Sequence, residues 1–263
     1  MIYKNKTAAL IFLLPALLMM VVFLYYPFIV NIINSFYDMS GLVQIAAPKY
    51  IGLQNYASMI ADPKIRVAVI NSFKMMGLTI LFQVGPALIL ALMVDSIKKG
   101  QQFFRTVYFF PIVISATAIG LMFNLFYNYN GGMLNQIRAM LSKPPVMWLS
   151  PQNAFLMISI PVLWQYVGFY FVILLTGLSN ISDDICDAAD IDGCTGFKKV
   201  IYIKIPLIRN VIGTSLVLAI TGALKVFDLP WVIAPHGAPG GMTHFLGTYM
   251  YEMTFAIGNV DYG

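Results

Sequence analysis

The chain has 263 residues, of which 59% are hydrophobic and only 10% are charged. Soluble domains carry about a quarter charged residues, so this chain has too little polar surface to cover a soluble globule and belongs to the membrane class. Its net charge of +5 is spread over many loops, without a single basic patch, which argues against nucleic-acid binding.

Five stretches are apolar and long enough to cross a bilayer, which takes about twenty residues. In chain order they are Ala8–Phe36, Val67–Val94, Thr106–Phe126, Phe155–Leu178 and Ile208–Val232. The first follows Lys4 and Lys6, as a signal peptide would, but it stays apolar beyond Pro27, so we expect a retained helix. The sequence therefore predicts an all-α polytopic membrane protein, with residues 1–263 forming a single transmembrane domain.

Loop charge predicts the orientation of these crossings. Lys and Arg are more frequent at the N-terminus and in loops 95–105 and 179–209 than in the alternate loops. Cationic loops favour the cytoplasmic side, so we expect the N-terminus in the cytoplasm. Five crossings would then leave Gly263 outside, unless a sixth crossing follows it.

Loop 181–206 is a charged island between two apolar segments. Ser182 can cap a helix whose first turn holds Asp183, and Gly193 permits the positive φ that ends a helix. Pro206 then starts the next crossing. The island is predicted to form a helix–turn–helix, which is either an amphipathic hairpin linking two crossings or a rigid lever set into a groove of a soluble partner.

The spacing within this island resembles a known motif. Asp187-Ala188-Ala189, Gly193, Ile203 and Ile205-Pro206 keep the spacing of Glu-Ala-Ala, Gly and Ile-x-Leu-Pro in the EAA loop of importer permeases of the ATP-binding-cassette superfamily. Asp187 stands where Glu is usual, which shortens the reach of the carboxylate by one methylene. Ile205 replaces Leu, one apolar residue for another.

Shorter matches extend the resemblance over nearly the whole chain, in the order of the family. They include Gly52-Leu53-Gln54-Asn55-Tyr56, Gly131-Gly132-Met133-Leu134-Asn135, Trp164, Phe227-Asp228 and Gly240-Gly241. The chain looks like a carbohydrate permease similar to the maltose-type F and glycerol-phosphate-type A components. The resemblance implies a sixth crossing after Gly263.

The resemblance also implies a division of labour between subunits. No GxxxxGK[ST] phosphate loop occurs in the chain, so ATP and Mg would be held by two separate ATPase subunits, with no cofactor and no enzyme activity on this chain. The further partners implied are a second permease, as a heterodimer, and an extracytoplasmic solute-binding protein, at a bacterial or archaeal plasma (inner) membrane. The residues expected to couple to the ATPase are Asp187, Ala188, Ala189, Asp190, Gly193, Ile203 and Pro206.

A sugar path needs hydrogen-bonding and aromatic groups inside the crossings. The candidates are Trp164, Gln165, Tyr166 and Phe169 in the fourth crossing and Thr221 and Lys225 in the fifth. The aromatic residues could instead pack between helices. Lys225 either faces a cavity or extends to the outer interface, where it could pair with Asp228.

Other functions remain open at this point. Cys186, Cys194, His236 and His244 lack the spacing of a metal site. A secondary transporter or channel without an ATPase would need intramembrane acids or broken helices, and the crossings hold few carboxylates, which argues against proton coupling. A structural or signalling membrane subunit is a third possibility.

Overall fold

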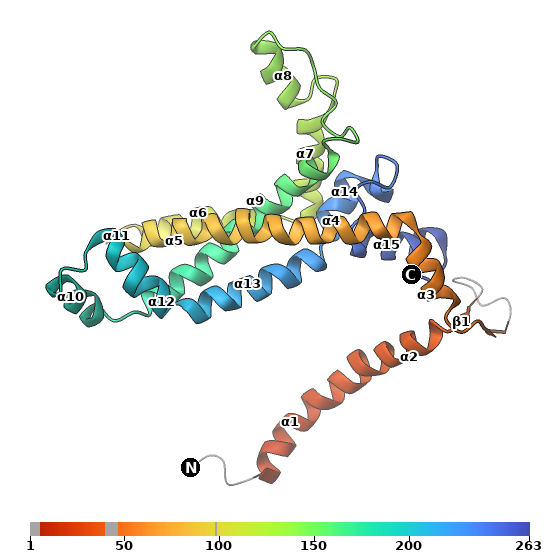
Figure 1. Ribbon diagram of the computed structural model, residues 1–263, viewed down its shortest axis with the longest axis horizontal. Helices are drawn as coiled ribbons and strands as arrows, with labels where there is room; N and C mark the ends of the chain where they lie inside the picture. The colour runs from red at the N-terminus through yellow and green to blue at the C-terminus, as the bar shows by residue number, and fades with distance from the viewer. Residues whose placement is uncertain (1–5, 40–46, 98) are drawn as a thin grey trace. The chain divides into compact units, whose positions relative to one another are not determined.

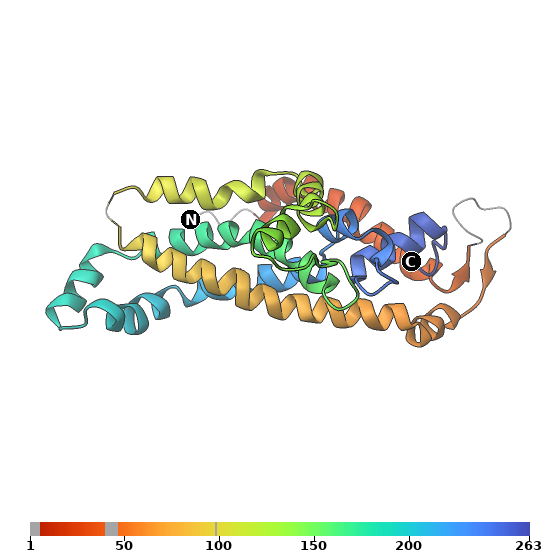
Figure 2. The same ribbon diagram turned by 90° about the horizontal axis from the view of Figure 1, so that it is seen from above.

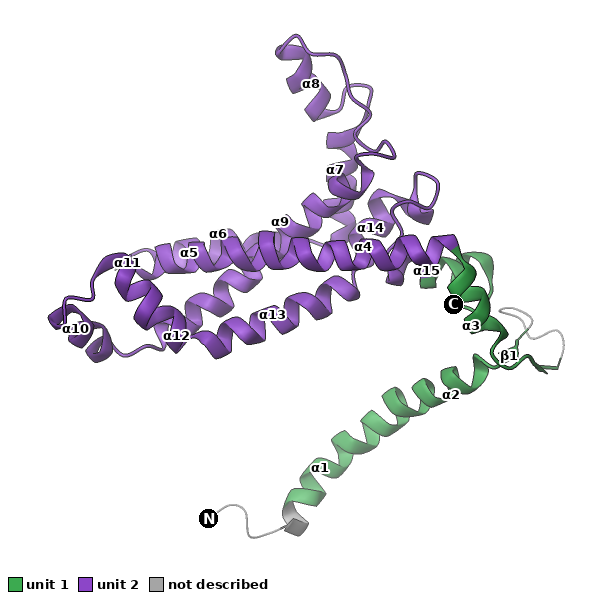
Figure 3. Cartoon of the chain, in the orientation of Figure 1, with its two compact units in different colours: residues 1–62, 250–263 green, residues 63–249 purple. Residues whose placement is uncertain are grey.

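The computed structural model describes residues 6–39, 47–97 and 99–263, and it divides into two compact units, coloured separately in Figure 3. Unit 1 comprises Met1–Asp62 and Met250–Gly263, and unit 2 comprises Pro63–Tyr249. Lys4 and the sixth crossing implied after Gly263 lie outside the described residues.

Unit 1 contains one long apolar helix and a small β-ladder. Its elements are α1 (Lys6–Met20), η2 (Val21–Tyr25), α2 (Tyr26–Asn34), β1 (Tyr37–Asp38), β2 (Lys49–Tyr50), α3 (Gln54–Ala61) and η6 (Glu252–Ile257). The two strands are antiparallel, with Tyr37 opposite Tyr50. Helix α3 is fastened to the end of α2, because the hydroxyl groups of Tyr56 and Ser35 are 2.7 Å apart and the Asn55 amide donates to the Ser35 carbonyl.

Unit 2 is a set of long helices that run alongside one another (Figures 1 and 2). Its elements are α4 (Pro63–Thr79), η3 (Ile80–Val84), α5 (Gly85–Asp95), α6 (Gln101–Val113), α7 (Ala116–Tyr127), α8 (Met133–Met140), α9 (Ala154–Ser179), α10 (Asp183–Ile191), α11 (Gly196–Lys199), η4 (Val200–Lys204), α12 (Ile205–Leu207), α13 (Arg209–Leu224), α14 (Asp228–Ile233) and η5 (Pro235–Gly237), and α15 (Leu246–Tyr251) leads from it into unit 1. Helices α5 and α6 pack on α9, and α13 packs on α4. Helices α10 and α11 lie at one end of these long helices, and α8 projects away from them (Figure 1).

Four helices among the described residues are long and apolar enough to cross a membrane. They are Ala9–Asn34, Pro63–Asp95, Ala154–Ser179 and Arg209–Ile233. They coincide with the first, second, fourth and fifth predicted crossings, and the second begins four residues earlier than predicted. A helical polytopic membrane protein is therefore confirmed at this level.

The third predicted crossing is not one straight helix. Helices α6 and α7 are bent by 86° against each other at a short break. At the break Ile114 and Ser115 are extended, and the Ser115 hydroxyl caps α7 by accepting a hydrogen bond from the Ala118 N–H. Pro111 weakens the end of α6 because it has no N–H to donate. Apolar composition alone does not reveal such a break.

Three of the long helical segments contain a widened π-helical turn just before a proline. Turns η2, η3 and η4 end two residues before Pro27, Pro86 and Pro206, respectively. A proline ring clashes with the carbonyl four residues earlier and leaves it without an N–H, and a widened turn relieves that clash.

Helix α9 is the centre of unit 2 and makes two unusually close contacts. Pro161 leaves the Met157 carbonyl without its helical partner, and the Tyr127 hydroxyl donates to that carbonyl at 2.8 Å. A Cβ added to Gly168 would lie 1.7 Å from the carbonyl oxygen of Tyr108. Glycine is therefore required where the backbones of α6 and α9 meet.

Two apolar clusters form the core of unit 2. One surrounds Ile158 and Phe245, and the other surrounds Phe171, Leu174 and Ile208. Both clusters include residues of α9, so this helix joins them into one core.

Candidate functional site

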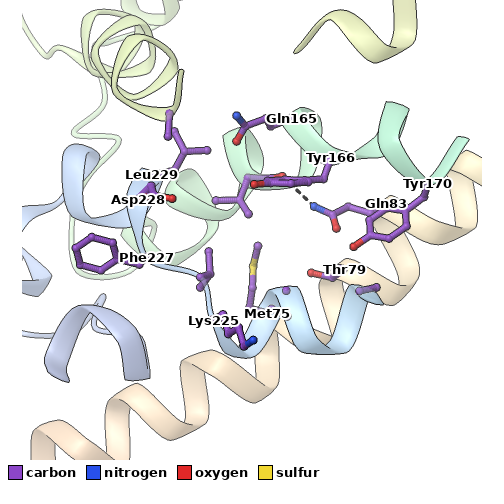
Figure 4. A pocket seen from close by; sticks show the side chains of 16 residues that line it. Met75, Thr79, Gln83, Gln165, Tyr166, Tyr170, Lys225, Phe227, Asp228 and Leu229 are labelled. Atoms are coloured by element: carbon purple, nitrogen blue, oxygen red, sulfur yellow. Dashed lines mark hydrogen bonds between the residues drawn. The ribbon is translucent and has the colours of Figure 1, made fainter. Parts of the chain in front are cut away.

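A cavity of about 220 Å³ opens between the long helices of unit 2, where the two apolar clusters meet (Figure 4). It is lined from helix α4 and turn η3, from the start of α7, from α9, from α13, from the segment that joins α13 to α14, and from the start of α14. The lining residues are Met75, Thr79, Gln83, Ala116, Val162, Gln165, Tyr166, Tyr170, Ala219, Gly222, Ala223, Lys225, Val226, Phe227, Asp228 and Leu229.

Two buried amide side chains hold the walls of this cavity together. The Gln83 amide donates to the Val162 carbonyl at 2.9 Å, and the Gln165 amide donates to the Ile114 carbonyl at 3.3 Å. Both side chains are at most 5% exposed. Among the described residues, neither amide oxygen has a hydrogen-bond partner. These oxygens can therefore accept hydrogen bonds from a hydroxyl-rich solute.

Charged and aromatic groups share the cavity with these amides. Lys225 and Asp228 both line it, and no ion pair joins them within the described part of the chain. Tyr166 and Tyr170 contribute phenol rings from α9, as Figure 4 shows. Amides, phenols and one charge of each sign around an apolar floor suit a polar organic solute.

The predicted path residues fall into two groups. Gln165, Tyr166 and Lys225 line the cavity. Trp164, Phe169 and Thr221 do not, as each has a contact elsewhere. The Trp164 ring lies 6.1 Å from that of Phe123, the Phe169 ring lies 5.3 Å from that of Tyr170, and the Thr221 hydroxyl donates to the Val217 carbonyl.

Sequence reasoning missed the wall that the second crossing supplies. Thr79 and Gln83 are buried and face the cavity, and Asp228 lines it from the next segment. A lone amide in the apolar run 80–94 was a usable signal for Gln83, because a buried polar group needs a partner. Thr79, four residues earlier at the end of α4, lines the same cavity.

The predicted helix–turn–helix is present as α10 and α11. Asp183 and Asp184 occupy the first turn of α10, and Gly193 has a φ of +74° directly after it. Ser182 precedes α10 as expected, although its side chain makes no capping hydrogen bond. The hairpin was therefore readable from local signals.

The predicted coupling residues are distributed over this hairpin and the helix that follows it. Asp187, Ala188 and Asp190 are exposed on α10, whereas Ala189 is buried. Ile203 lies in the π-helical turn η4 and Pro206 lies in α12. Gly193, in the turn after α10, and Pro206 are exposed as well, whereas Ile203 is half-buried. Ile203 and Pro206 belong to the segment that returns toward α13.

Two features give the hairpin a defined surface. Ile191 is 87% exposed and Phe197 is 79% exposed. The Asp190 carboxylate accepts a hydrogen bond from the Lys199 ammonium at 2.6 Å, which raises the pKa of Lys199 and ties α10 to α11. The hairpin therefore exposes apolar side chains, and an ion pair holds its two helices together.

The described residues offer no metal centre. Across residues 6–39, 47–97 and 99–263, no three His, Cys, Asp or Glu side chains gather in a way that could hold a metal ion.

Comparison with known proteins identifies the family. Residues 72–258, more than two thirds of the chain, match the family described as binding-protein-dependent transport system inner membrane component. The chain belongs to this family. Its members are ABC transporter permeases, so the chain is the membrane subunit of a transporter and not itself a catalytic enzyme.

Individual relatives agree with this assignment. The permease is 31% identical to the "Probable ABC transporter permease protein YurN" of Bacillus subtilis, over 97% of this chain and 88% of that relative. It is 28% identical to the arabinooligosaccharides transport system permease protein AraP of the same organism, over 99% and 83% of the two chains.

A solved structure shares the fold. A chain of a bacterial alginate ABC transporter, crystallised with a periplasmic protein that holds an alginate pentasaccharide, superposes with a TM-score of 0.83. The two chains are 21% identical, and the match covers 98% of this permease and 87% of the other chain. Several apolar helices and an inner-membrane family together make this permease a multi-pass membrane protein.

Proposed function

We propose that this permease is a subunit of an ATP-driven, binding-protein-dependent importer for a sugar or oligosaccharide, and that its α10–α11 hairpin docks on an ATPase subunit. AraP is named as an arabinooligosaccharide permease and the similar solved chain belongs to an alginate transporter, which favours a carbohydrate solute. In this proposal the hairpin is the EAA coupling loop within residues 181–206, with Asp187, Ala188, Asp190 and Gly193 at its contact surface.

The observation that carries the docking proposal is the exposure of the hairpin. Ile191 and Phe197 lie outside the candidate membrane-spanning helices and are exposed in this chain, which costs free energy unless a partner covers them. Exposed carboxylates at Asp187 and Asp190 flank these apolar side chains. An apolar centre rimmed by charge is the composition of a protein–protein interface.

This docking surface orients the permease in the membrane. ATPase subunits operate in the cytosol, so the hairpin end of unit 2 would be cytoplasmic. The cationic loops 95–105 and 179–209 lie on the same side, in agreement with the positive-inside rule. The N-terminus then also lies in the cytoplasm.

The cavity is proposed as part of the solute path. Its volume of about 220 Å³ is below the ~300–1,000 Å³ of pockets that enclose drug-sized ligands. A second permease subunit, most simply a different chain, would complete the path and alternate with this one between two packings. No cofactor is needed on this chain, because ATP and Mg would be bound by two ATPase subunits and the solute would arrive from an extracytoplasmic binding protein.

The test is coupling in the reconstituted complex. The permease would be placed in vesicles with its partner permease, ATPase and binding protein, and solute-stimulated ATP hydrolysis would be measured. Asp187→Lys and Gly193→Pro should reduce stimulation to the basal rate, because the first reverses a contact charge and the second removes the φ of +74° that turns the hairpin.

A matched variant separates the effect of the side-chain charge from the effect of any substitution at position 187. Asp187→Glu keeps the carboxylate and should keep the stimulation within about twofold, since conservative exposed substitutions have small effects. Full stimulation in Asp187→Lys and in Gly193→Pro would contradict the docking proposal.

A further inference from the structure

One ion pair connects the hairpin segment to the cavity-bearing helix. The Lys204 ammonium lies 2.5 Å from the Asp95 carboxylate, although the two residues are 109 positions apart in the chain. The side chains are only 18% and 13% exposed, respectively. A pair this sheltered from water holds its geometry more firmly than a surface pair.

Asp95 lies at a position where a negative charge is electrostatically unfavourable. It is the last residue of α5, where the helix dipole presents its negative end. An acid there is unfavourable unless a cation neutralises it, and Lys204 is the cation in contact. The pair therefore has a specific electrostatic reason to persist.

Asp95 belongs to the helix that lines the cavity, and Lys204 belongs to the segment that carries the hairpin. Asp95 ends the 33-residue helix Pro63–Asp95, and Gln83 lies twelve residues back along it, about 18 Å at 1.5 Å per residue. Lys204 ends the π-helical turn η4, directly after α11 of the hairpin. The ion pair thus joins the element that lines the cavity to the element that carries the hairpin.

The other contacts of this region are either local or less directional. The Lys199–Asp190 pair lies within the hairpin itself. Ala87, Ala91 and Val94 of α5 pack in an apolar cluster with residues of α9 and with Ile208, which follows the hairpin segment. Apolar contacts between small side chains resist sliding of one helix along another only weakly. A directional, partly buried ion pair resists that sliding.

We infer that Asp95 and Lys204 are positioning residues that transmit movement of the α10–α11 hairpin to the cavity wall formed by Thr79 and Gln83. This inference rests on the proposed docking of the hairpin on an ATPase. It adds that the route to the cavity runs through the ion pair, along the helix Pro63–Asp95.

The experiment measures solute taken up per ATP hydrolysed in vesicles that contain the complete complex. Asp95→Asn and Lys204→Gln should each lower this ratio about tenfold, the size of a typical coupling energy. The charge exchange Asp95→Lys with Lys204→Asp should restore the ratio to within about threefold, because it rebuilds the pair and places a cation at the end of α5. A residue that served stability alone would change the amount of complex and leave the ratio unchanged.

Lys99→Gln is the matched control. Lys99 is exposed, lies four residues after Asp95 and forms no ion pair within the described residues. Its neutralisation should leave the ratio unchanged. An unchanged ratio in Asp95→Asn and Lys204→Gln overturns the inference, as does a charge exchange that assembles without restoring uptake.

Parallel measurement of Asp187→Lys separates the two proposals. If Asp187→Lys uncouples the complex while the ion-pair variants do not, only the present inference fails. If Asp187→Lys stays coupled, the docking proposal fails. Should the single variants not assemble, the charge exchange decides: an assembled and coupled exchange supports the inference, and any other result overturns it.

Discussion

The α10–α11 hairpin exposes apolar side chains to solvent, whereas polar side chains are buried around the cavity of unit 2. Phe197 is 79% exposed on the hairpin, and Gln83 is 2% exposed beside the cavity. An exposed aromatic ring loses the free energy of burial, whereas the buried Gln83 amide is stabilised by its hydrogen bond to the Val162 carbonyl. Under the proposed function the two regions have different roles: the hairpin presents an exposed surface to a protein partner, and the cavity presents buried amides to a solute.

The largest effect is expected where helix packing encloses the cavity. Gly168→Ala would place a methyl group 1.7 Å from the Tyr108 carbonyl oxygen, so α6 and α9 must separate and the folded permease should be lost from the membrane fraction. Gly213→Ala is the matched control, because a Cβ there meets nothing within 4 Å. Equal yields of the two variants would show that α6 and α9 do not pack this closely.

The second-largest effect is expected on binding of the ATPase to the hairpin. Phe197→Ala should weaken ATPase binding by about 1–3 kcal/mol, or roughly tenfold or more, without lowering thermal stability, since the ring is exposed in this chain. Binding can be measured by titrating the purified ATPase subunit onto the permease in nanodiscs. Met147→Ala, which removes a 68% exposed apolar side chain elsewhere, should bind normally.

The cavity side is tested with its buried amides. Gln165→Leu should raise the solute concentration needed for half-maximal uptake about tenfold, because it removes one hydrogen-bonding group worth about 1–1.5 kcal/mol. Basal ATP hydrolysis should not change. Thr221→Val is the control, since the Thr221 hydroxyl bonds within its own helix; a similar loss in that variant would mean that the cavity is not where solute selectivity resides.

The smallest effect concerns the packing around Pro161. Tyr127→Phe removes the donor to the Met157 carbonyl and should lower the free energy of unfolding by about 1 kcal/mol. Uptake per ATP should stay at the wild-type value. A thermal-shift measurement detects the change, and an unaltered melting temperature would show that this hydrogen bond contributes nothing to stability.

The sequence predicted the hairpin better than the cavity, for a physical reason. Asp183 and Gly193 influence only the backbone within a few residues of their own positions. Capping and turn chemistry therefore determine the hairpin from local sequence. In an apolar helix, by contrast, no local capping or turn signal shows which face lines the cavity. The π-helical turn η3 also shifts the helical register between Thr79 and α5, so a 3.6-residue period does not predict which side faces the cavity.

The break between α6 and α7 was hidden for a related reason. Residues 106–126 are uniformly apolar, and their composition predicts one crossing. The 86° bend arises at Ile114 and Ser115, where the chain becomes extended and a serine cap restarts the helix. Pro111 and Ser115 together were the available signal.

Site-specific photo-cross-linking tests the central claim, that the hairpin is the surface that docks on the ATPase. A photoreactive residue would replace Ile191 on the hairpin or Met140 at the end of α8, two apolar side chains that are 87% and 83% exposed. The account predicts a cross-link from position 191 to the ATPase subunit and none from position 140. A cross-link to the ATPase from position 140, with none from position 191, would contradict it.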